Sequence, residues 1–311
     1  MTGLQKQELE LRSYAKINLA LDVTGIRPDG YHSVDTVMQR VSLFDLVNIG
    51  WQEQDSDSVN RETPVQIRLS TTKPYLPTDQ RNLAYQAALA MLERAEACGQ
   101  KKTGLLTIRI EKRIPVAAGL GGGSSNCAAM LIGLNRLWKL QQSTKQLCAI
   151  AEQLGSDIPF CVLTQNTSYR CAIGSGRGEK LQVLRYPLRK YLILAKPAFG
   201  VSTREVFAGI DDCVITDHPD MKLLKKALMQ RQDEAIYRNM INVLEAYTLT
   251  HYPRVKALKD AIAATEDVRK VLMSGSGPTV IGVYDSFGAA KRACKEIRKA
   301  GFEAYWADTI K

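Results

Sequence analysis

Residues 115–125 read PVAAGLGGGSS, a glycine-rich segment with a different pattern on each side. Upstream, apolar residues occupy every second position of 106–110, a spacing that predicts a half-buried strand. Downstream, apolar residues recur at helical spacing over 128–138, with Ser124 or Ser125 as the expected N-cap of a helix. The segment is therefore predicted to join a strand to a helix.

The glycines of this segment allow the backbone to turn tightly and to approach a ligand closely. The helix that follows would offer unpaired N–H groups and the positive end of its dipole, which favours a bound phosphate. The spacing excludes two familiar motifs: Ser124 stands where a dinucleotide fingerprint needs glycine, and residues 119–125 lack the P-loop lysine. A phosphate-binding loop is favoured, and a flexible turn remains the alternative.

The composition is that of a globular protein with room for two domains. The chain has 311 residues, of which 45% are hydrophobic and 24% charged, and its formal net charge is +10. Such a surplus of Lys and Arg suits a nucleic acid, an acidic membrane surface or a phosphorylated substrate. Because the basic residues are scattered and do not alternate with aromatic residues over a long run, most of them are expected on solvated faces.

The seven cysteines are odd in number and contain no C-x-x-C pair. This usage predicts reduced thiols rather than a disulfide framework or a zinc site. The opening MTGLQKQELEL has no apolar core of the kind found in signal peptides, and no apolar run is long enough to span a bilayer. We therefore expect a cytoplasmic protein with no membrane partner.

The first part of the chain predicts a strand over 14–23, a turn at 28–30 that presents Tyr31 and His32, and a strand around 65–69. A polar stretch at 52–61 is expected to form a hairpin loop, and 83–98 a helix that ends at Gly99. Lys16 and Asn18 share one face of the first strand, and a solvated edge is the expectation for such a pair taken alone.

Ser143 and Gln146 form a capping-box pattern at the start of another helix, which is expected to end near 154 with Gly155 as a left-handed cap. Asp157 follows, and it either begins a turn or serves as a base near the phosphate loop. A glycine-rich turn is predicted at 174–179 and a basic linker at 185–189.

The last part of the chain predicts a buried strand at 191–195 and a short helix that contains Phe207, introduced by a capping box at 202–205. Helices are expected at 221–230, 234–247, 254–265 and 287–300, a turn at 272–278, and strands ending at 284 and 306. Strands and helices mix without regular alternation, which predicts an α+β fold in two domains, 1–187 and 188–311.

Five stretches resemble, in this order, the motifs of the GHMP kinases. They are AKINLALDVTGIRPDGYH (15–32), IPVAAGLGGGSSN (114–126), LGSDIPF (154–160), NVLE (242–245) and MSGSGPTV (273–280). The first and third stretches resemble the branch of the family that acts on a cytidine diphosphate-linked methylerythritol. The resemblance implies an ATP-binding N-terminal domain like domain 2 of ribosomal protein S5 and a ferredoxin-like C-terminal domain.

The resemblance implies that the whole loop wraps the phosphates of ATP. Its residues are Pro115, Val116, Ala117, Ala118, Gly119, Leu120, Gly121, Gly122, Gly123, Ser124 and Ser125. Mg²⁺ is expected with the nucleotide, but the loop has no carboxylate and the metal ligands are unknown. Ala117 stands where the superfamily often has glycine, Asn126 stands where aspartate or alanine is also common, and residues 168–170 have no match.

The catalytic pair of the family falls on Lys16 and Asp157, and Asn18 would help to hold the region of the substrate hydroxyl. Phosphoryl transfer depends on positioning and charge neutralisation more than on covalent help. Asp157 would accept the proton of the attacking hydroxyl, and Lys16 would stabilise the aspartate and the transferring group.

Tyr31 and His32 match the residues that receive the cytosine in this branch, and Phe207 matches a ring that stacks on the other side of the base. Two flanking aromatic rings and a histidine at the hydrogen-bonding edge would recognise cytidine. The implied reaction is ATP-dependent phosphorylation of the 2-hydroxyl of the methylerythritol compound in the non-mevalonate isoprenoid pathway.

Two alternatives remain open. Another GHMP kinase, acting on homoserine, mevalonate or a sugar, would share the loop without needing a nucleobase clamp. A nucleic-acid-binding protein would suit the net charge and the S5-like topology, but it would give no reason for Asp157 near the phosphates. We expect a small-molecule substrate and no nucleic acid.

Overall fold

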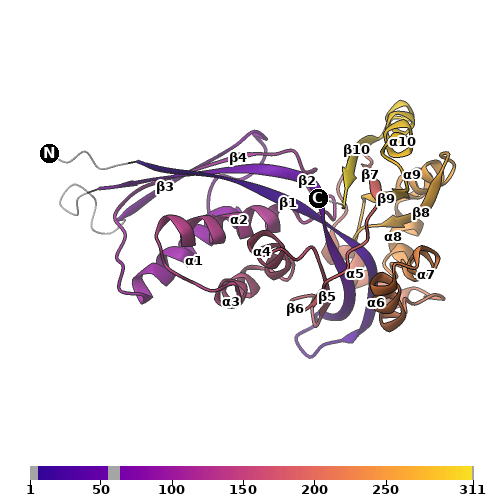
Figure 1. The fold of residues 1–311 in the computed structure, drawn as a ribbon, viewed down its shortest axis with the longest axis horizontal. Helices are drawn as coiled ribbons and strands as arrows, with labels where there is room; N and C mark the ends of the chain where they lie inside the picture. Colours follow the sequence, from indigo (N-terminus) through magenta and orange to yellow (C-terminus); the bar gives the residue numbers. More distant parts are fainter. Residues whose placement is uncertain (1–5, 55–63, 310–311) are drawn as a thin grey trace. The chain divides into compact units, whose positions relative to one another are not determined.

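The computed structural model describes residues 6–54 and 64–309 (Figure 1). The chain divides into two compact units. The first consists of the described residues within Met1–Tyr14, Phe44–Ile114 and Gly122–Ser168, and the second of those within Ala15–Leu43, Pro115–Gly121 and Tyr169–Lys311. The two long N-terminal strands therefore contribute residues to both units. The predicted boundary between residues 187 and 188 stays a prediction.

The first unit packs helices against one side of a sheet (Figure 1). Its strands come from β1 (Gln7–Ile26), β2 (His32–Glu53), β3 (Val65–Thr71) and β4 (Gly104–Glu111), and its helices are α1 (Leu83–Ala97), α2 (Gly122–Leu137), α3 (Thr144–Leu154) and α4 (Ile158–Asn166). β4 pairs with β3 in parallel and with β2 antiparallel, and Leu46 lies opposite Glu111. The predicted strand before the glycine segment and the helix at 83–98 are confirmed.

Helix α2 is the central helix of this unit. Every residue from Ser125 to Leu134 is buried, which is typical of a helix that is covered on all sides. Gly133 allows a close approach to β2, because a Cβ at this position would overlap the side chain of Ile49. The packing of α2 fixes the helix end that follows the glycine segment.

The second unit contains two sets of strands. The first part of β2 pairs antiparallel with β5 (Cys171–Ser175), which pairs with β6 (Lys180–Leu184). A separate antiparallel sheet has the order β10–β7–β9–β8, formed by Glu303–Asp308, Tyr191–Lys196, Val280–Tyr284 and Val268–Met273. The turn predicted at 174–179 joins β5 to β6 at residues 176–179.

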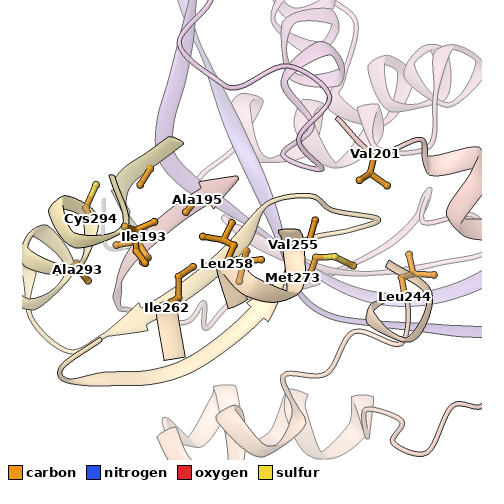
Figure 2. Close-up of a cluster of buried hydrophobic side chains, with 14 of the residues drawn as sticks. Ile193, Ala195, Val201, Leu244, Val255, Leu258, Ile262, Met273, Ala293 and Cys294 are labelled. Atoms are coloured by element: carbon orange, nitrogen blue, oxygen red, sulfur yellow. The ribbon is translucent and has the colours of Figure 1, made fainter. Parts of the chain in front are cut away.

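The helices of this unit are α5 (Thr203–Gly209), η2 (Ile210–Asp212), α6 (Met221–Gln230), α7 (Asp233–Asn239), α8 (Glu245–His251), α9 (Pro253–Ala263) and α10 (Phe287–Lys299). Helices α9 and α10 contact the separate sheet, and the apolar side chains between them form a buried cluster (Figure 2). Ile193, Leu258, Ile262 and Met273 lie in this cluster. The two sheets with their helices confirm the predicted α+β architecture.

The start of α2 differs from the expectation. The helix begins at Gly122, so Ser124 and Ser125 lie inside its first turns and neither is the N-cap. Gly121 has a positive φ of 65°, which lets the chain enter the helix earlier than the serines suggested. The Ser125 hydroxyl instead donates to the Tyr14 carbonyl oxygen at 2.5 Å, so it serves packing within the first unit.

Two other cap predictions need correction. The capping box of Ser143 is confirmed, but Gly155 has φ 162° and ψ 152°, which is extended rather than left-handed backbone. Ser202 accepts a hydrogen bond from the Glu205 N–H, as expected for an N-cap. The Glu205 carboxylate, however, accepts from the Tyr252 hydroxyl at 2.7 Å instead of completing a capping box.

The helix predicted at 234–247 is two helices, α7 and α8. Asn242 lies between them, where its side chain accepts from the Leu244 N–H and so replaces a helical hydrogen bond. The turn predicted at 272–278 is shorter, because β8 continues to Met273. The polar loop predicted at 52–61 begins with strand residues up to Glu53, and most of it lies outside the described residues.

All seven cysteines lie within the described residues, and none of them is in a disulfide, as predicted. Burial raises the pKa of the Cys171 thiol to about 12, which keeps it protonated at neutral pH. Over residues 6–54 and 64–309, no helix has the length and apolarity that crossing a bilayer requires.

Candidate active site

The loop 115–121 approaches a second turn closely within the second unit. Gly119 has a φ of 70°, and a Cβ there would overlap the Ser274 carbonyl oxygen and lie 3.0 Å from that of Gly277. The Ser274 hydroxyl donates to the Gly119 carbonyl oxygen at 3.1 Å. Glycine is therefore required at 119 by the protein's own turn 274–278.

Lys16 lies against the end of this loop. Its backbone N–H donates to the Leu120 carbonyl oxygen at 3.0 Å. Its side-chain stem passes Gly121, where an added Cβ would lie 2.9 Å from Lys16 Cγ. The residue is only 4% exposed, so the solvated edge expected for this face of the strand is wrong.

A row of buried polar groups continues from Lys16 along the strands. Lys16 Nζ donates to Asn18 Oδ1 at 2.8 Å, and Asn18 Nδ2 donates to Thr36 Oγ1 at 2.8 Å. The Asn18 N–H donates to the Ser274 hydroxyl at 3.3 Å. The structure thus brings Lys16, Asn18 and the loop 115–121 together. It adds Thr36 and Ser274, of which only Ser274 lies in a stretch that the sequence had singled out.

The NVLE stretch supports the turn 274–278. Asn242 Nδ2 donates to the carbonyl oxygens of Met273 at 2.8 Å and Gly275 at 2.7 Å. Glu245 Oε1 accepts from the Met273 N–H at 2.7 Å. These side chains are therefore anchors for the turn that packs on the loop.

Asp157 is the N-terminal boundary residue of α4 in the first unit, with helical backbone angles. Its carboxylate does not cap the helix, and its backbone carbonyl accepts from the Cys161 N–H at 3.2 Å. Lys16 belongs to the second unit. The pairing of Lys16 with Asp157 therefore stays a prediction.

His32 and Phe207 lie together in the second unit, with ring centroids 5.4 Å apart and planes inclined by 39°. His32 Nε2 lies 3.0 and 3.2 Å from the two carboxylate oxygens of Asp211, and its side chain is only 9% exposed. Asp211 was not predicted; it follows Phe207 by four residues, but a single aspartate there carries no motif. The Asp211 contact holds the His32 ring in one orientation.

Tyr31 is 59% exposed, and the Arg177 guanidinium lies 5.5 Å from its ring centroid. The turn before it is held by Asp29, whose carboxylate accepts from the Arg27 guanidinium and the Tyr31 N–H. The hydrogen bond from Arg27 keeps the pKa of Asp29 below its ordinary value. The predicted turn at 28–30 is confirmed, and it presents Tyr31 to solvent beside Arg177.

Among the described residues, no cluster of three or more His, Cys, Asp or Glu side chains could hold a metal by itself. Mg²⁺ at nucleotide sites is commonly held by substrate phosphates, water and one or two protein oxygens. Of the two hydroxyls at the start of α2, that of Ser125 already bonds Tyr14. Ser124 supplies the other side-chain hydroxyl of the loop.

Two family models match the chain: the GHMP kinases N terminal domain over residues 82–165, and the GHMP kinases C terminal domain over residues 217–303. A homoserine kinase from Cytophaga hutchinsonii has the same fold, with a TM-score of 0.68 at 17% identity over 97% of this chain and 95% of that one. The fold and the loop define a GHMP kinase, a class of ATP-dependent phosphotransferases.

Nearer relatives narrow this class. The 4-diphosphocytidyl-2-C-methyl-D-erythritol kinase of Exiguobacterium sibiricum is 41% identical over 95% of this chain and 96% of its own, and that of Bacillus subtilis is 40% identical over 91% of each. A crystal structure of 4-(cytidine 5'-diphospho)-2C-methyl-D-erythritol kinase matches with a TM-score of 0.74 and 32% identity, over 96% of this chain and 98% of that one. The chain belongs to the 4-diphosphocytidyl-2-C-methyl-D-erythritol kinase family.

Proposed function

We propose that this chain transfers the γ-phosphoryl group of ATP to the 2-hydroxyl of 4-diphosphocytidyl-2-C-methyl-D-erythritol, a step of non-mevalonate isoprenoid precursor synthesis. The observation that carries the proposal is the buried row of Lys16, Asn18 and Thr36, which joins the glycine loop through the Lys16 N–H and the Ser274 hydroxyl. A lysine is kept in this low-exposure position at a cost in desolvation, which favours a functional role.

The proposed reaction needs one proton acceptor and one cation. The substrate hydroxyl oxygen attacks the γ-phosphorus, its proton passes to the Asp157 carboxylate, and ADP leaves with the electrons of the broken P–O bond. The Lys16 ammonium, held by Asn18, stabilises the negative charge that develops on the transferring group. Because Lys16 is fixed by a strand and a hydrogen bond, little reorganisation is needed when ATP binds.

The loop from Pro115 to Ser125 would hold the phosphates through its backbone N–H groups and the N-terminus of α2. Ala117 has a φ of 50°, a left-handed conformation that glycine adopts more easily. Its Cβ faces Gly200, where an added Cβ would lie only 2.8 Å away. The alanine thus adds a packing contact where the superfamily often has glycine.

Mg²⁺ would reach this site with the nucleotide and would neutralise charge on its phosphates. The Ser124 hydroxyl is the side-chain oxygen that we assign to it. The cytosine would be received by Tyr31 and His32, with the Phe207 ring stacking on its other side. The His32 ring is held for this role by Asp211.

The surplus of basic residues would serve phosphorylated small molecules rather than a nucleic acid. The lack of disulfides among the seven cysteines remains the reason for expecting a cytoplasmic protein.

The decisive assay is ADP release by the purified chain with ATP, Mg²⁺ and one of three alcohols. 4-Diphosphocytidyl-2-C-methyl-D-erythritol, homoserine and mevalonate are offered in parallel at equal concentration. We expect turnover with the first alone. ADP release with homoserine or mevalonate and none with the cytidine compound would refute the proposed substrate and leave the family assignment intact.

Two variants test the proposed chemistry in the same assay. Lys16→Met and Asp157→Asn should each lower kcat by at least about two orders of magnitude, by analogy with the loss of a single transition-state contact. Thermal unfolding should show that both variants are folded. Full activity in either variant would remove that residue from the mechanism.

A further inference from the structure

We propose that Asp45 is a positioning residue that fixes both ends of the phosphate-binding loop. It lies on β2 in the first unit and is fully buried. None of the sequence motifs includes it. The inference rests on the proposed function in one respect, which is that the loop is taken to hold ATP.

The upstream end of the loop is bound by one carboxylate oxygen. Asp45 Oδ1 accepts from the Arg113 N–H at 2.7 Å and from the Ile114 N–H at 2.8 Å. These are the last two residues before Pro115. Two backbone N–H groups on one charged oxygen form a strong, directional contact.

The downstream end is bound by the other oxygen. Asp45 Oδ2 accepts from Asn126 Nδ2 at 2.9 Å, and Asn126 is the fifth residue of α2. Asn126 Nδ2 also donates to the Ser13 hydroxyl at 2.8 Å. The Asp45 side chain therefore connects the two residues before Pro115 to the first turns of α2.

The charge of Asp45 would oppose a phosphate at the start of α2 if it stood alone. Lys112 removes this conflict, because its ammonium pairs with Asp45 Oδ2 and donates to Asn126 Oδ1 at 3.0 Å. The same ammonium lies 3.2 Å from the place that a Cβ on Gly122 would occupy. The pair thus supplies the connection without adding net charge at the proposed anion site.

This network has a consequence for binding. The loop 115–121 contains two glycines with positive φ, a backbone that is free to adopt other conformations when its ends are released. Fixing both ends lowers the entropy that the loop loses when it closes on the phosphates. Removing the network should therefore weaken nucleotide binding beyond its effect on folding.

Two asparagines of α2 provide a matched test. Asn126→Ala removes the link from Asp45 to the helix. Asn135→Ala, nine residues further along, removes two hydrogen bonds between the Asn135 side chain and the Gln142 backbone. Both variants delete an amide from the same helix, and only the first removes a partner of Asp45. The readout is the Kd of a non-hydrolysable ATP analogue by calorimetry, with the melting temperature of each variant alongside.

We expect Asn126→Ala to raise the Kd by about fivefold or more, the equivalent of one net hydrogen bond, and Asn135→Ala to leave it within about twofold. The KM for the acceptor alcohol should change in neither. Equal Kd values in the two variants would overturn the inference. If the unaltered chain fails to bind the analogue, the proposed function itself fails.

Asp45→Asn extends the test to the carboxylate. It should raise the Kd further than Asn126→Ala, because an amide offers only one acceptor oxygen and leaves Lys112 without its anion. An unchanged Kd in a folded Asp45→Asn protein would overturn the inference. If this variant does not fold, the comparison of Asn126→Ala with Asn135→Ala decides alone.

Discussion

Replacing Gly121 by alanine should disturb Lys16 directly. Gly121 has a φ of 65°, and the new Cβ would lie 2.9 Å from Lys16 Cγ and 3.3 Å from Cε. The first of these distances is about half an ångström shorter than ordinary van der Waals contact, which begins near 3.4 Å. Either the loop or the lysine stem must therefore move.

The cost has two parts. A non-glycine residue in the left-handed region loses about 1–2 kcal/mol, and forcing an added methyl group into a packed site costs about 1–3 kcal/mol more. Gly121→Ala should thus lower the free energy of unfolding by about 2–5 kcal/mol. A displacement of the ammonium approaching 1 Å would lower kcat by about tenfold to a hundredfold.

Gly301→Ala is the matched control. Gly301 has a φ of 85°, and a Cβ there would meet no atom within 4 Å. It should therefore show the backbone cost of about 1–2 kcal/mol without the overlap, and its kcat should be unchanged. Urea unfolding and the ADP-release assay measure both quantities. Equal destabilisation in the two variants, or a normal kcat in Gly121→Ala, would refute the contact between this glycine and the lysine.

Three further predictions test other parts of the molecule. Asp211→Leu should raise the KM for the cytidine substrate by about tenfold with the KM for ATP unchanged, because the His32 ring loses the partner that orients it; an unchanged KM would argue against the nucleobase site. Asn242→Ala should lower the free energy of unfolding in urea by about 2–4 kcal/mol, since two buried carbonyl oxygens lose their donor. The hydrogen bond from Lys190 holds the pKa of Asp285 below its ordinary value, so the stability contributed by Asp285 is complete above about pH 4 and is lost as the pH falls through the folded pKa. Asp285→Asn should therefore destabilise the protein at pH 6, and the difference from the unaltered chain should shrink as the pH falls below about 4.

Local patterns were sufficient for most of the fold. The strand before the loop, the helix that ends at Gly99 and the capping box of Ser143 depend on neighbours within a few residues, and the structure has all three. At Ser202 the N-cap was predicted correctly, but the capping box was not. The Glu205 carboxylate instead bonds Tyr252, which is far away in the sequence. Side chains that bond across the fold are the ones that local patterns misplace.

The candidate site depends even more than the fold on contacts between residues that are distant in the sequence. The sequence placed Lys16 and Asn18 on one strand face, but their burial depends on Thr36 and Ser274, which come from other strands and turns. Asp45 gave no signal beyond a charged residue among apolar neighbours in a strand. In the sequence, Asp45 is 69 residues from Ile114 and 81 residues from Asn126, so only the folded chain brings them together.

The glycine spacing matches neither the dinucleotide fingerprint nor the P-loop, and the structure shows a physical reason. In the dinucleotide and P-loop motifs, the spacing of the glycines is set by a ligand that the backbone must approach. Here Gly119 makes room for the carbonyl oxygen of Ser274, and Gly121 makes room for the stem of Lys16. The loop is therefore shaped by protein atoms that pack against these two glycines. The spacing of the glycines therefore follows the geometry of this fold. The turn 274–278 and the part of β1 that carries Lys16 belong to the motif as much as the glycines do.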